Sequence, residues 1–472
     1  MIAAALALAL PASALSKSHV SYVTDQDPFL TAAAAGVEIV PLINSGDEVF
    51  GDLFEGLPDG IGAVPAPGNQ GYVDLYVNHE NSHVPFLGTA DYVDSSVTRV
   101  RVDIASQSVI DMDVPLPASL GYIRFCSNFM AGPDQGFPHY TLITNEESND
   151  VIPVPAGAPY GADPALTPNR QAGYSLALDT VTGKVTTLFG AGRHNHENQV
   201  VVPGGWNGMY SLSGDDTFSA PSSQLYLFGS PKWQTYIQGD GQLWAFRVTA
   251  TDEGAVDATD PFNDANDYLE IDTGDHWSGE FIPVPEDIAR GLTGDAPQTA
   301  LENWSNANNV FQFIRIEDID YDPDNPRVVY FADTGTNRLA EDPNTGRLFR
   351  GPSGTGVTEN GRIFRIELNA DDPTQVDDFS ILADANDLGM RSPDNLDVGH
   401  DTIMVQEDTS SFSKIWAYDM GADSWTPVAA TAMADAESSG ILDVSDTFGD
   451  GWWALVVQDH TPADWVASEP AP

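Results

Sequence analysis

The apolar segments of this chain are short and are bounded by Gly, Asp, Asn and Pro. They are rich in β-branched and aromatic residues and rarely follow a helical period, so they predict strands and turns. Three segments predict clear hairpins, each with a strand, a polar turn and a returning strand. Their sequences are TRVRVDIASQSVIDMDV, SLALDTVTGKVTTLFG and KIWAYDMGADSWTPV. The pattern therefore predicts an all-β protein.

One strand pattern recurs along the chain, because six apolar segments end in a polar, mostly acidic cluster. These segments are DLYVNHE to Glu80, YTLITNEE to Glu147, GMYSLSGDD to Asp216, VVYFADT with Asp333, TIMVQED to Asp408 and WALVVQDH to His460. A second short element with its own ligand-type residue lies upstream of each segment. The upstream residues are Asp59, Cys126, Glu197, Glu317, Asp394 and Glu437.

The spacing of these clusters indicates a repeat architecture. The two members of a pair lie about one hairpin apart, and most clusters recur about 50 to 75 residues apart, which suits a four-stranded blade with insertions. One interval is longer and contains an acidic, Trp-rich insert around residues 255–310. We therefore predict a six-bladed β-propeller.

A propeller would bring the repeated polar residues together, because its innermost strands run along a central channel. Carboxylates confined in one place cannot all stay ionised unless cations hold them. The pattern thus predicts a central metal cluster. The alternative is that the acidic strand ends only form turns, for which Asp and Asn are well suited.

The residue types at these positions indicate which ions would bind. Numerous carboxylate oxygens suit Ca²⁺, which takes six to eight oxygen ligands. Cys126, the single cysteine of the chain, does not suit calcium, since a thiolate prefers a softer or redox-capable ion such as iron or zinc. A lone cysteine is more often a small core residue, but the place of Cys126 within one of the six upstream elements favours a ligand.

Basic residues are few, and three arginines lie inside or beside the upstream elements: Arg124, Arg193 and Arg315. The guanidinium group binds phosphate or carboxylate in a bidentate manner. These arginines are therefore candidates for binding an anion at the metal cluster. The alternative is that each one pairs with a neighbouring acid.

The overall charge excludes some classes of partner. The chain has 70 acidic and 19 basic residues, a formal net charge of −51. Such a surface repels nucleic acid and anionic lipid. Gly and Pro are spread along the chain and mark no linker, so we expect a single domain over residues 17–472 and a monomer.

The start of the chain predicts export. MIAAALALALPASALS combines a short apolar run with the small residues Ala12 and Ala14, which fits a signal peptide over residues 1–16. The run is too short to span a bilayer, and no later segment is long enough. We expect a secreted protein, periplasmic or extracellular, without a membrane span.

Several common catalytic motifs are absent from the sequence: the Gly-x-Ser-x-Gly elbow, the phosphate loop with Lys and Ser/Thr, and the HExxH zinc motif. The segment HNHE, residues 194–197, has a superficial similarity to a zinc motif. In a strand, however, His194 and His196 share one face and Glu197 takes the other, so only part of the segment can reach one site.

With these residues in hand, the chain resembles the PhoX family of alkaline phosphatases over nearly its whole length. The resemblance rests on the order and spacing of RFCSN, YTLITNEES, GRHNHENQVVV, YSLSGDD, RIEDIDYDP, SPDNLDV, VQED and ESSGILDVSD with WWALVVQDH. It implies a secreted six-bladed propeller with a central cluster of iron and calcium. The family often has a second cysteine before the paired glutamates, and Asn145 stands at that place here.

The resemblance also implies roles for individual residues. Cys126 matches a ligand of ferric iron, and Arg315 matches an arginine that faces substrate phosphate, with Arg124 a second candidate for that role. The residues that match metal ligands, or that fall in matching segments, are Glu197, Glu317, Asp394, Glu80, Glu146, Glu147, Asp215, Asp216 and Glu407.

The expected activity is hydrolysis of small phosphomonoesters by a metal-dependent alkaline phosphatase with Ca²⁺ and Fe³⁺. Metal ions can both neutralise phosphate charge and provide a nucleophile near neutral pH. Two alternatives remain open at this point. One is a calcium-dependent propeller esterase or lactonase, which needs neither iron nor the thiolate, and the other is a non-catalytic surface propeller that calcium stabilises.

Overall fold

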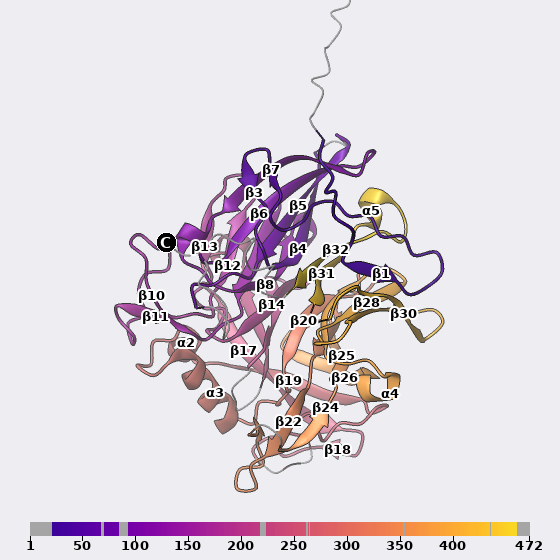
Figure 1. Cartoon of the computed structure of the whole chain (residues 1–472). Helices are drawn as coiled ribbons and strands as arrows, with labels where there is room; N and C mark the ends of the chain where they lie inside the picture. The colour runs from indigo at the N-terminus through magenta and orange to yellow at the C-terminus, as the bar shows by residue number, and fades with distance from the viewer. Residues whose placement is uncertain are drawn as a thin grey trace, which may run out of the picture.

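The computed structural model of the protein describes residues 21–67, 70–84, 93–217, 223–260, 263, 265–352, 355–434 and 436–459. The predicted signal peptide, residues 1–16, lies outside the described residues, and so does His460. Strands form most of the regular structure (Figure 1). The all-β class predicted from the sequence is confirmed.

Six antiparallel strand pairs form the inner part of the molecule, and they coincide with the six predicted pairs of sequence elements. The pairs are β4 (Pro58–Pro65) with β5 (Tyr72–His79), β8 (Phe125–Ala131) with β9 (Thr141–Glu146), β14 (His196–Val202) with β15 (Met209–Asp215), β20 (Ile316–Tyr321) with β21 (Val328–Asp333), β27 (Pro393–Val398) with β28 (Thr402–Glu407), and β31 (Ala436–Asp443) with β32 (Trp453–Asp459). We refer to each pair and its outer strands as a unit, numbered one to six in chain order.

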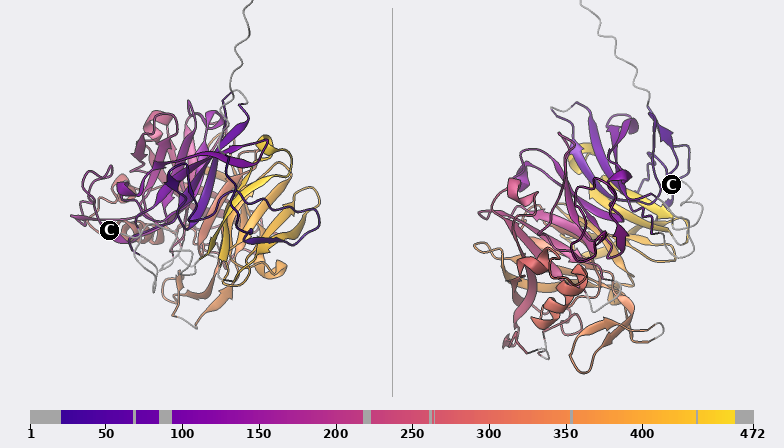
Figure 2. Two further views of the ribbon diagram at one scale, coloured as in Figure 1. Left: turned by 45° about the horizontal axis from the view of Figure 1, so that its top comes forward. Right: turned by 90° about the vertical axis from the view of Figure 1, so that its left-hand side faces the viewer.

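The first strands of the six pairs close into a ring. In turn, β4 contacts β8, β8 contacts β14, β14 contacts β20, β20 contacts β27, β27 contacts β31, and β31 returns to β4. Figures 1 and 2 show the chain passing once around the molecule, so that its indigo start lies beside its yellow end. This propeller-like arrangement of blades is the one expected from the repeat.

Among the described residues, outer strands extend five of the six pairs. They are β6 (Ser96–Asp103) and β7 (Ser108–Leu116) on the first pair, β12 (Ser175–Asp179) and β13 (Val185–Thr187) on the second, β16 (Leu225–Ser230) and β17 (Gln242–Thr251) on the third, β25 (Arg362–Leu368) and β26 (Gln375–Asp384) on the fourth, and β29 (Lys414–Asp419), β30 (Ser424–Thr431) and β1 (Leu30–Ala32) on the fifth. The third and fourth units share one ten-stranded sheet, because β19 (Trp277–Pro283) pairs with both β17 and β26. All three predicted hairpins are present, as β6–β7, β12–β13 and β29–β30.

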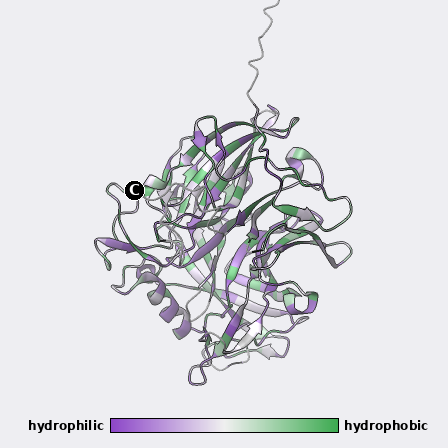
Figure 3. Ribbon diagram, in the orientation of Figure 1, coloured by the Kyte–Doolittle hydropathy of each residue, from purple (hydrophilic) through white to green (hydrophobic). Residues whose placement is uncertain are grey.

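Apolar side chains fill the space between neighbouring units. The largest cluster lies between the third and fourth units and contains phenylalanines whose rings meet edge to face. The ring of Phe313 lies 5.3 Å from that of Phe331 and 5.2 Å from that of Phe364, measured between centroids. Each such aromatic pair contributes about 0.5–1.5 kcal/mol beyond the burial of its area. Hydrophilic colour is not confined to the loops, since it also appears on strands in the middle of the molecule (Figure 3).

The long interval between the third and fourth pairs contains helices that the sequence pattern did not predict. They are α2 (Glu286–Ala289) and α3 (Pro297–Ala307), and they contact each other. Pro297 begins α3, which suits proline because the first helical N–H needs no partner. Gln298 and Glu302 of α3 are buried. Gln298 donates a hydrogen bond to Asp215 of β15, so this helix contacts an inner strand.

The remaining elements are short. They are β2 (Glu48–Val49), β3 (Asp52–Leu53), β10 (Val151–Pro153), β11 (Asn169–Gln171), β18 (Gly254–Ala255), β22 (Thr336–Glu341), β23 (Leu348–Arg350), β24 (Val357–Glu359), α1 (Trp233–Tyr236), α4 (Ala385–Leu388), α5 (Ser445–Phe448) and the 3-10 turns Ala118–Leu120 and Pro133–Gln135. Among the described residues, no helix is long and apolar enough to cross a membrane.

Candidate metal centre

The register of the six strand pairs places equivalent residues at equivalent positions. Each second strand ends at a residue that pairs with the start of the first strand, as Glu146 does with Phe125 and Asp333 does with Ile316. Directly after the paired residue, each first strand carries one of the predicted upstream residues: Asp59, Cys126, Glu197, Glu317, Asp394 and Glu437. Because the first strands form the ring, these residues belong to one level of it.

A second set of residues follows the ends of the second strands. Within the described ranges these are Glu80, Glu147, Asp216, Thr334 and Asp408. The backbone N–H of Glu147 donates to the carbonyl of Arg124, and the same bond links Asp216 to Asn195 and Thr334 to Arg315. The bond recurs because the chain leaves each unit in the same way. Four of the five side chains are carboxylates, so both sets bring acid to one end of the channel.

Three overlapping groups of side chains could each hold a cation. The first is Cys126, Glu147 and Glu197, the second is Glu147, Asp216 and Glu317, and the third is Glu197, Glu317 and Asp394. Within each group, one ligand atom of each residue lies within 4.8 Å of the others. Glu147, Glu197 and Glu317 each belong to two groups. The three candidate positions are therefore contiguous and share bridging carboxylates.

Cys126 lies at one side of this cluster and is not an inert core residue. Its thiol donates a hydrogen bond to Asp59, with Sγ 3.2 Å from Oδ2. Asp59 also accepts bonds from Ser439 and, at 2.6 Å, from Gln458 Nε2, so strands from the first and last pairs meet at this carboxylate. Burial raises the pKa of Asp59 to about 7, and the charge of Glu80 adds to the effect.

Glu197 is held at the centre of the cluster by two donors from β8. Ser127 Oγ lies 2.7 Å from Glu197 Oε1, and the Ser127 N–H donates to Oε2 at 3.3 Å. The histidines beside Glu197 face away from it, as the strand alternation predicted. Their rings are 3.5 Å apart between centroids, and both reach Ser213 Oγ. The segment 194–197 thus contributes one carboxylate to the centre and no imidazole.

Arg315 is the basic group closest to the carboxylates. It donates two hydrogen bonds to Asp216, from Nε to Oδ1 at 2.7 Å and from Nη2 to Oδ2 at 2.8 Å. Its Nη2 also lies 3.1 Å from Glu317 Oε1. That oxygen is buried and accepts no hydrogen bond from the described residues. The arginine therefore offsets part of the negative charge of Asp216 and Glu317.

The other two arginines have different surroundings. Arg124 Nη1 lies 3.7 Å from Glu80 Oε1, and its Nη2 donates to the carbonyl of Val84 at 2.9 Å, so it lies at the edge of the cluster. Arg193 is buried, stacks on the ring of Tyr174 at 3.8 Å and donates to the carbonyl of Gln171. An anion at the cluster fits beside Arg315 and Arg124, but Arg193 is packed away from the cluster.

The clustered acids would hold protons in the absence of a cation. Burial raises the pKa of Glu147, Glu197 and Glu317 well above the ordinary range, and repulsion between their neighbouring carboxylates adds to it. Burial and nearby acids raise the pKa of the Cys126 thiol as well. A bound cation reverses this balance, because ligand groups must be deprotonated and the metal favours their charged forms.

Four of the predicted ligands do not join any of these groups, and one of them, Glu80, lies beside Arg124. Glu146, Asp215 and Glu407 end β9, β15 and β28, and donors of the protein itself bind their carboxylates. Glu146 forms a buried ion pair with Arg170, Asp215 accepts from Gln298 and Thr217, and Glu407 accepts from Trp416 Nε1. Asp333 has the same place in the fourth pair and accepts the N–H groups of Ile314 and Gly335.

The site also includes residues that were not among the candidate ligands. Asp59, Asp408 and Glu437 had been recognised as repeat members only. Burial raises the pKa of Glu437, and Asp408 and Asp394 add to the effect, so these three acids are close to one another. On the opposite side, Asn195 Nδ2 lies 3.4 Å from Glu147 Oε1, and its N–H donates to Gln298 of α3. The long insert is the one sequence feature that could have indicated this contact. Its sequence, however, does not show which residues of the ring the insert would reach.

The donor set fits calcium together with one softer ion. Most ligand atoms are carboxylate oxygens, which suit a hard cation with many ligands. The single thiol is in the same group as Glu147 and Glu197, and sulfur in a mixed donor set suits a transition ion such as iron.

Comparison with known proteins supports the fold. The structure of Pseudomonas fluorescens PhoX in complex with vanadate, a transition state analogue, is similar over 82% of this chain and 82% of its own length, with a TM-score of 0.56 and 15% identity. A Mycobacterium tuberculosis puromycin-hydrolyzing peptidase is similar over 88% of this chain and 45% of its own length, with a TM-score of 0.34 and 11% identity. No family model and no curated protein matches the chain.

Proposed function

We propose that this protein is a metal-dependent hydrolase of phosphomonoesters, with calcium and iron in the channel. The observation that carries the proposal is the set of three contiguous groups in which Glu147, Glu197 and Glu317 are shared, with Cys126 in one group and Arg315 beside another. A fold similar to that of PhoX is consistent with the same chemistry.

The residues of the cluster would have two roles, since some would bind the metal ions and others would bind the substrate. Glu147, Glu197, Glu317 and Asp394 would hold calcium, and Cys126 with Glu147 and Glu197 would hold iron. Bound there, the metal ions supply positive charge that polarises phosphoryl oxygens and lowers the pKa of a coordinated water. The carboxylates themselves are poor partners for a phosphate dianion, so substrate binding depends on those ions and on the arginines.

Arg315 would act on the phosphoryl group directly. Its guanidinium is fixed by two bonds to Asp216, and a group held in this way loses little entropy when it binds an oxyanion. Arg124 lies beside Glu80 and would be a second contact for the substrate. Ser127 and Ser439 donate to Glu197 and Asp59, so neither is a free nucleophile, and we favour direct hydrolysis over a covalent intermediate.

Metal analysis combined with a phosphatase assay tests this proposal. The native protein should contain calcium and iron by mass spectrometry and should hydrolyse p-nitrophenyl phosphate at alkaline pH. Cys126→Ser should lose iron and activity, whereas Glu286→Gln, an exposed control on α2, should keep both. Complete inactivity of protein with both metals bound contradicts the proposal.

The same measurements separate the two alternatives. A calcium-dependent esterase or lactonase would contain calcium without iron and would tolerate Cys126→Ser. A non-catalytic propeller would lose stability with a chelator and would show no turnover. Export of the protein is part of our proposal, and N-terminal sequencing of the mature protein would detect cleavage near Ala14.

A further inference from the structure

The fourth unit differs from the others at the end of its second strand. A carboxylate follows the second strand in four of the five described cases, but Thr334 follows β21. Thr334 is 2% exposed, and its Oγ1 forms no hydrogen bond with a described residue. At this level of the channel, the fourth unit therefore contributes a hydroxyl group in place of a negative charge.

An insertion begins directly after Thr334. The chain forms a three-stranded sheet, in the order β23–β22–β24, before it returns to the unit in β25. Figure 1 shows β22 and β24 together at the edge of the molecule. We call residues 336–350, which form β22, β23 and the turn between them, the insertion hairpin. Its turn carries Asp342, and its other end lies next to Thr334 in the chain.

The insertion hairpin is fixed against the segment that leads into Arg315. At the start of the hairpin, the N–H of Thr334 donates to the carbonyl of Arg315 at 2.9 Å. In β23, the N–H of Leu348 donates to Gln312 Oε1 at 2.9 Å, and Gln312 Nε2 donates to the carbonyl of Leu348 at 3.4 Å. Both strands are thus attached to residues 312–315, and the hairpin lies beside the metal centre.

Two arginines lie at the end of the insertion hairpin that adjoins Thr334. Arg350 pairs with Leu339 in the register, and the N–H of Gly351 donates to the carbonyl of Arg338 at 2.7 Å. Arg338 is half-buried and forms no ion pair with a described residue, and Arg350 is exposed. Arg338 lies four residues after Thr334, so their Cα atoms are at most about 13 Å apart in an extended strand.

Arg315 is close to these two arginines. Burial of part of the side chain lowers the pKa of Arg350, and the charges of Arg338 and Arg315 lower it further, whereas Asp216 raises it. The chain has 19 basic and 70 acidic residues, so three guanidinium groups in one place are an exception in this protein. Since a guanidinium group binds phosphate or carboxylate in a bidentate manner, the three suit an anion with more than one charged group.

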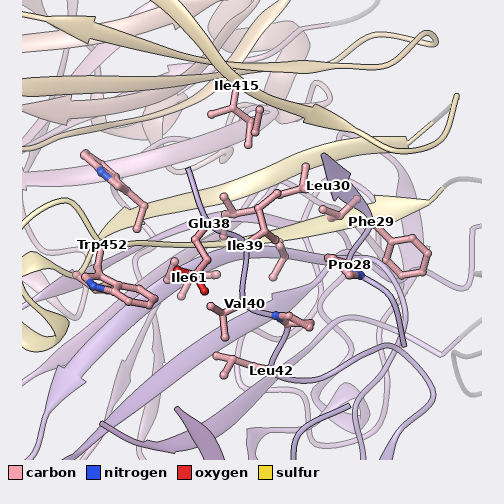
Figure 4. Close-up of a pocket in the computed structure, with 18 of the residues that line it drawn as sticks. Pro28, Phe29, Leu30, Glu38, Ile39, Val40, Leu42, Ile61, Ile415 and Trp452 are labelled. Atoms are coloured by element: carbon pink, nitrogen blue, oxygen red, sulfur yellow. The ribbon is translucent and has the colours of Figure 1, made fainter. Parts of the chain in front are cut away.

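The cavity of about 660 Å³ that residues 36–45 and 452–457 help to line offers no comparable site. Figure 4 shows apolar side chains around it, Ile39 and Ile415 among them. None of the described residues that line the cavity is Lys or Arg. An anionic part of a substrate has no cationic partner there, whereas the insertion hairpin provides two.

We propose that Arg338 and Arg350 form a second anion-binding subsite beside Arg315, and that the protein prefers phosphomonoesters carrying a second phosphate or carboxylate group. The inference rests on the proposed function. The phosphoryl group that is hydrolysed would lie at the metal centre with Arg315, and the second anionic group of the same molecule would lie at the insertion hairpin. Thr334 precedes the hairpin and adds no negative charge that would repel such a substrate. Arg338 and Arg350 take no part in bond cleavage and determine specificity alone.

A matched set of substrates tests the preference. Metal-loaded protein should hydrolyse 1,6-hexanediol bisphosphate with a kcat/KM about 10- to 100-fold higher than that for hexyl phosphate, because a hydrogen bond to a charged group contributes a factor of that size. The third probe, 6-phosphonooxyhexanoate, carries a carboxylate in place of the second phosphate. A gain with either anionic probe supports the proposal, and no gain with either one overturns it.

Substitutions at the insertion hairpin locate the preference. The double variant Arg338→Gln with Arg350→Gln should lose most of the gain with the bisphosphate, mainly through KM, and its activity toward hexyl phosphate should fall far less. Arg350→Lys keeps the charge and should keep part of the gain. Lys184→Gln, an exposed position in the turn between β12 and β13, removes the same charge elsewhere and is the matched control. Equal losses with hexyl phosphate and the bisphosphate would contradict a separate subsite.

Binding measurements separate failure of this inference from failure of the proposed function. Isothermal titration of metal-loaded protein should show tighter binding of 1,6-hexanediol bisphosphate than of hexyl phosphate, with the difference lost in the double variant. If that preference is present but neither compound is hydrolysed, the subsite stands and the proposed phosphatase activity is wrong. If both compounds are hydrolysed equally well and bind equally tightly, the phosphatase activity stands and the subsite is wrong.

Discussion

Glu146 and Glu147 are neighbours at the end of β9, and both are buried, yet their surroundings are opposite. Glu146 accepts bonds from the N–H groups of Ile123 and Tyr174 and pairs with Arg170. Glu147 faces Glu197, Glu317 and Asp216 and has Asn195 as a weak donor at 3.4 Å. Hydrogen bonds and an ion pair compensate the charge of Glu146, whereas Glu147 lies among other carboxylates.

This comparison shows how one repeat produces two kinds of acid. The last residue of a second strand points into its own unit, where backbone N–H groups of the crossing chain can bind it. The next residue, a carboxylate in four of the five described cases, points toward the channel, where other units contribute further carboxylates. Burying a charge is costly unless a partner compensates it. The first kind therefore stabilises the fold without help, whereas the second kind depends on a cation.

The largest expected effect is that of replacing Glu146, whose charge is compensated by Arg170. Glu146→Ala should lower the free energy of unfolding by about 3–5 kcal/mol, because it leaves the buried Arg170 without its carboxylate. Urea unfolding of metal-free protein would measure this change. Glu147→Ala is the matched control and should be neutral or stabilising under the same conditions, since it removes an uncompensated acid. Equal losses for the two variants would contradict the distinction.

The acids of the channel should instead respond to metal. Glu197→Gln should weaken calcium binding by more than the roughly 100-fold that loss of an outer partner costs, because Glu197 belongs to two of the three groups. Isothermal titration of metal-free protein with calcium would measure it. Unchanged affinity in Glu197→Gln, with Glu286→Gln as the control, would remove Glu197 from the centre.

Stability of the metal-free protein should fall as the pH rises. Burial raises the pKa of Asp333 to about 7, and also that of Asp318. A carboxyl group whose folded pKa is raised stabilises the fold below its unfolded pKa, and that contribution is lost as the pH rises through the folded pKa. We expect a loss of roughly 2–3 kcal/mol for each of these two groups between pH 5 and pH 8, since each folded pKa lies about two units above pH 5 and one pKa unit corresponds to about 1.4 kcal/mol.

Thermal unfolding with a chelator at the two pH values would measure this loss. Saturating calcium at pH 8 should restore much of the stability through the channel acids, which the metal holds in their charged forms. Higher stability at pH 8 than at pH 5 in the metal-free protein would contradict the prediction.

The smallest expected effect is that of replacing Glu407, which ends β28 as Glu146 ends β9. Glu407→Gln should cost about 1 kcal/mol, because the amide still accepts from Trp416 Nε1 and Arg391 N–H but opposes the N–H of Lys414. Calcium affinity should stay unchanged, since Glu407 belongs to none of the three groups. A calcium affinity that falls as it does in Glu197→Gln would place Glu407 with the channel acids.

The sequence alone determined the all-β class, the six pairs of strands and the residues of the inner ring. It could do so because strand alternation and turn residues are local, and because the repeat places Asp59, Cys126, Glu197, Glu317, Asp394 and Glu437 at one position of each pair. The opposite directions of Glu197 and its neighbouring histidines also follow from alternation.

Only the tertiary structure decided which acids converge. Glu146 and Glu147 are the same residue type, and so are Asp215 and Asp216. Their roles differ because residues from distant parts of the chain contact them, namely Arg170, Arg315 and Gln298 of α3. Pattern fixes which face of a strand a side chain takes, whereas the partners that compensate its charge or cover its edge come from long-range packing.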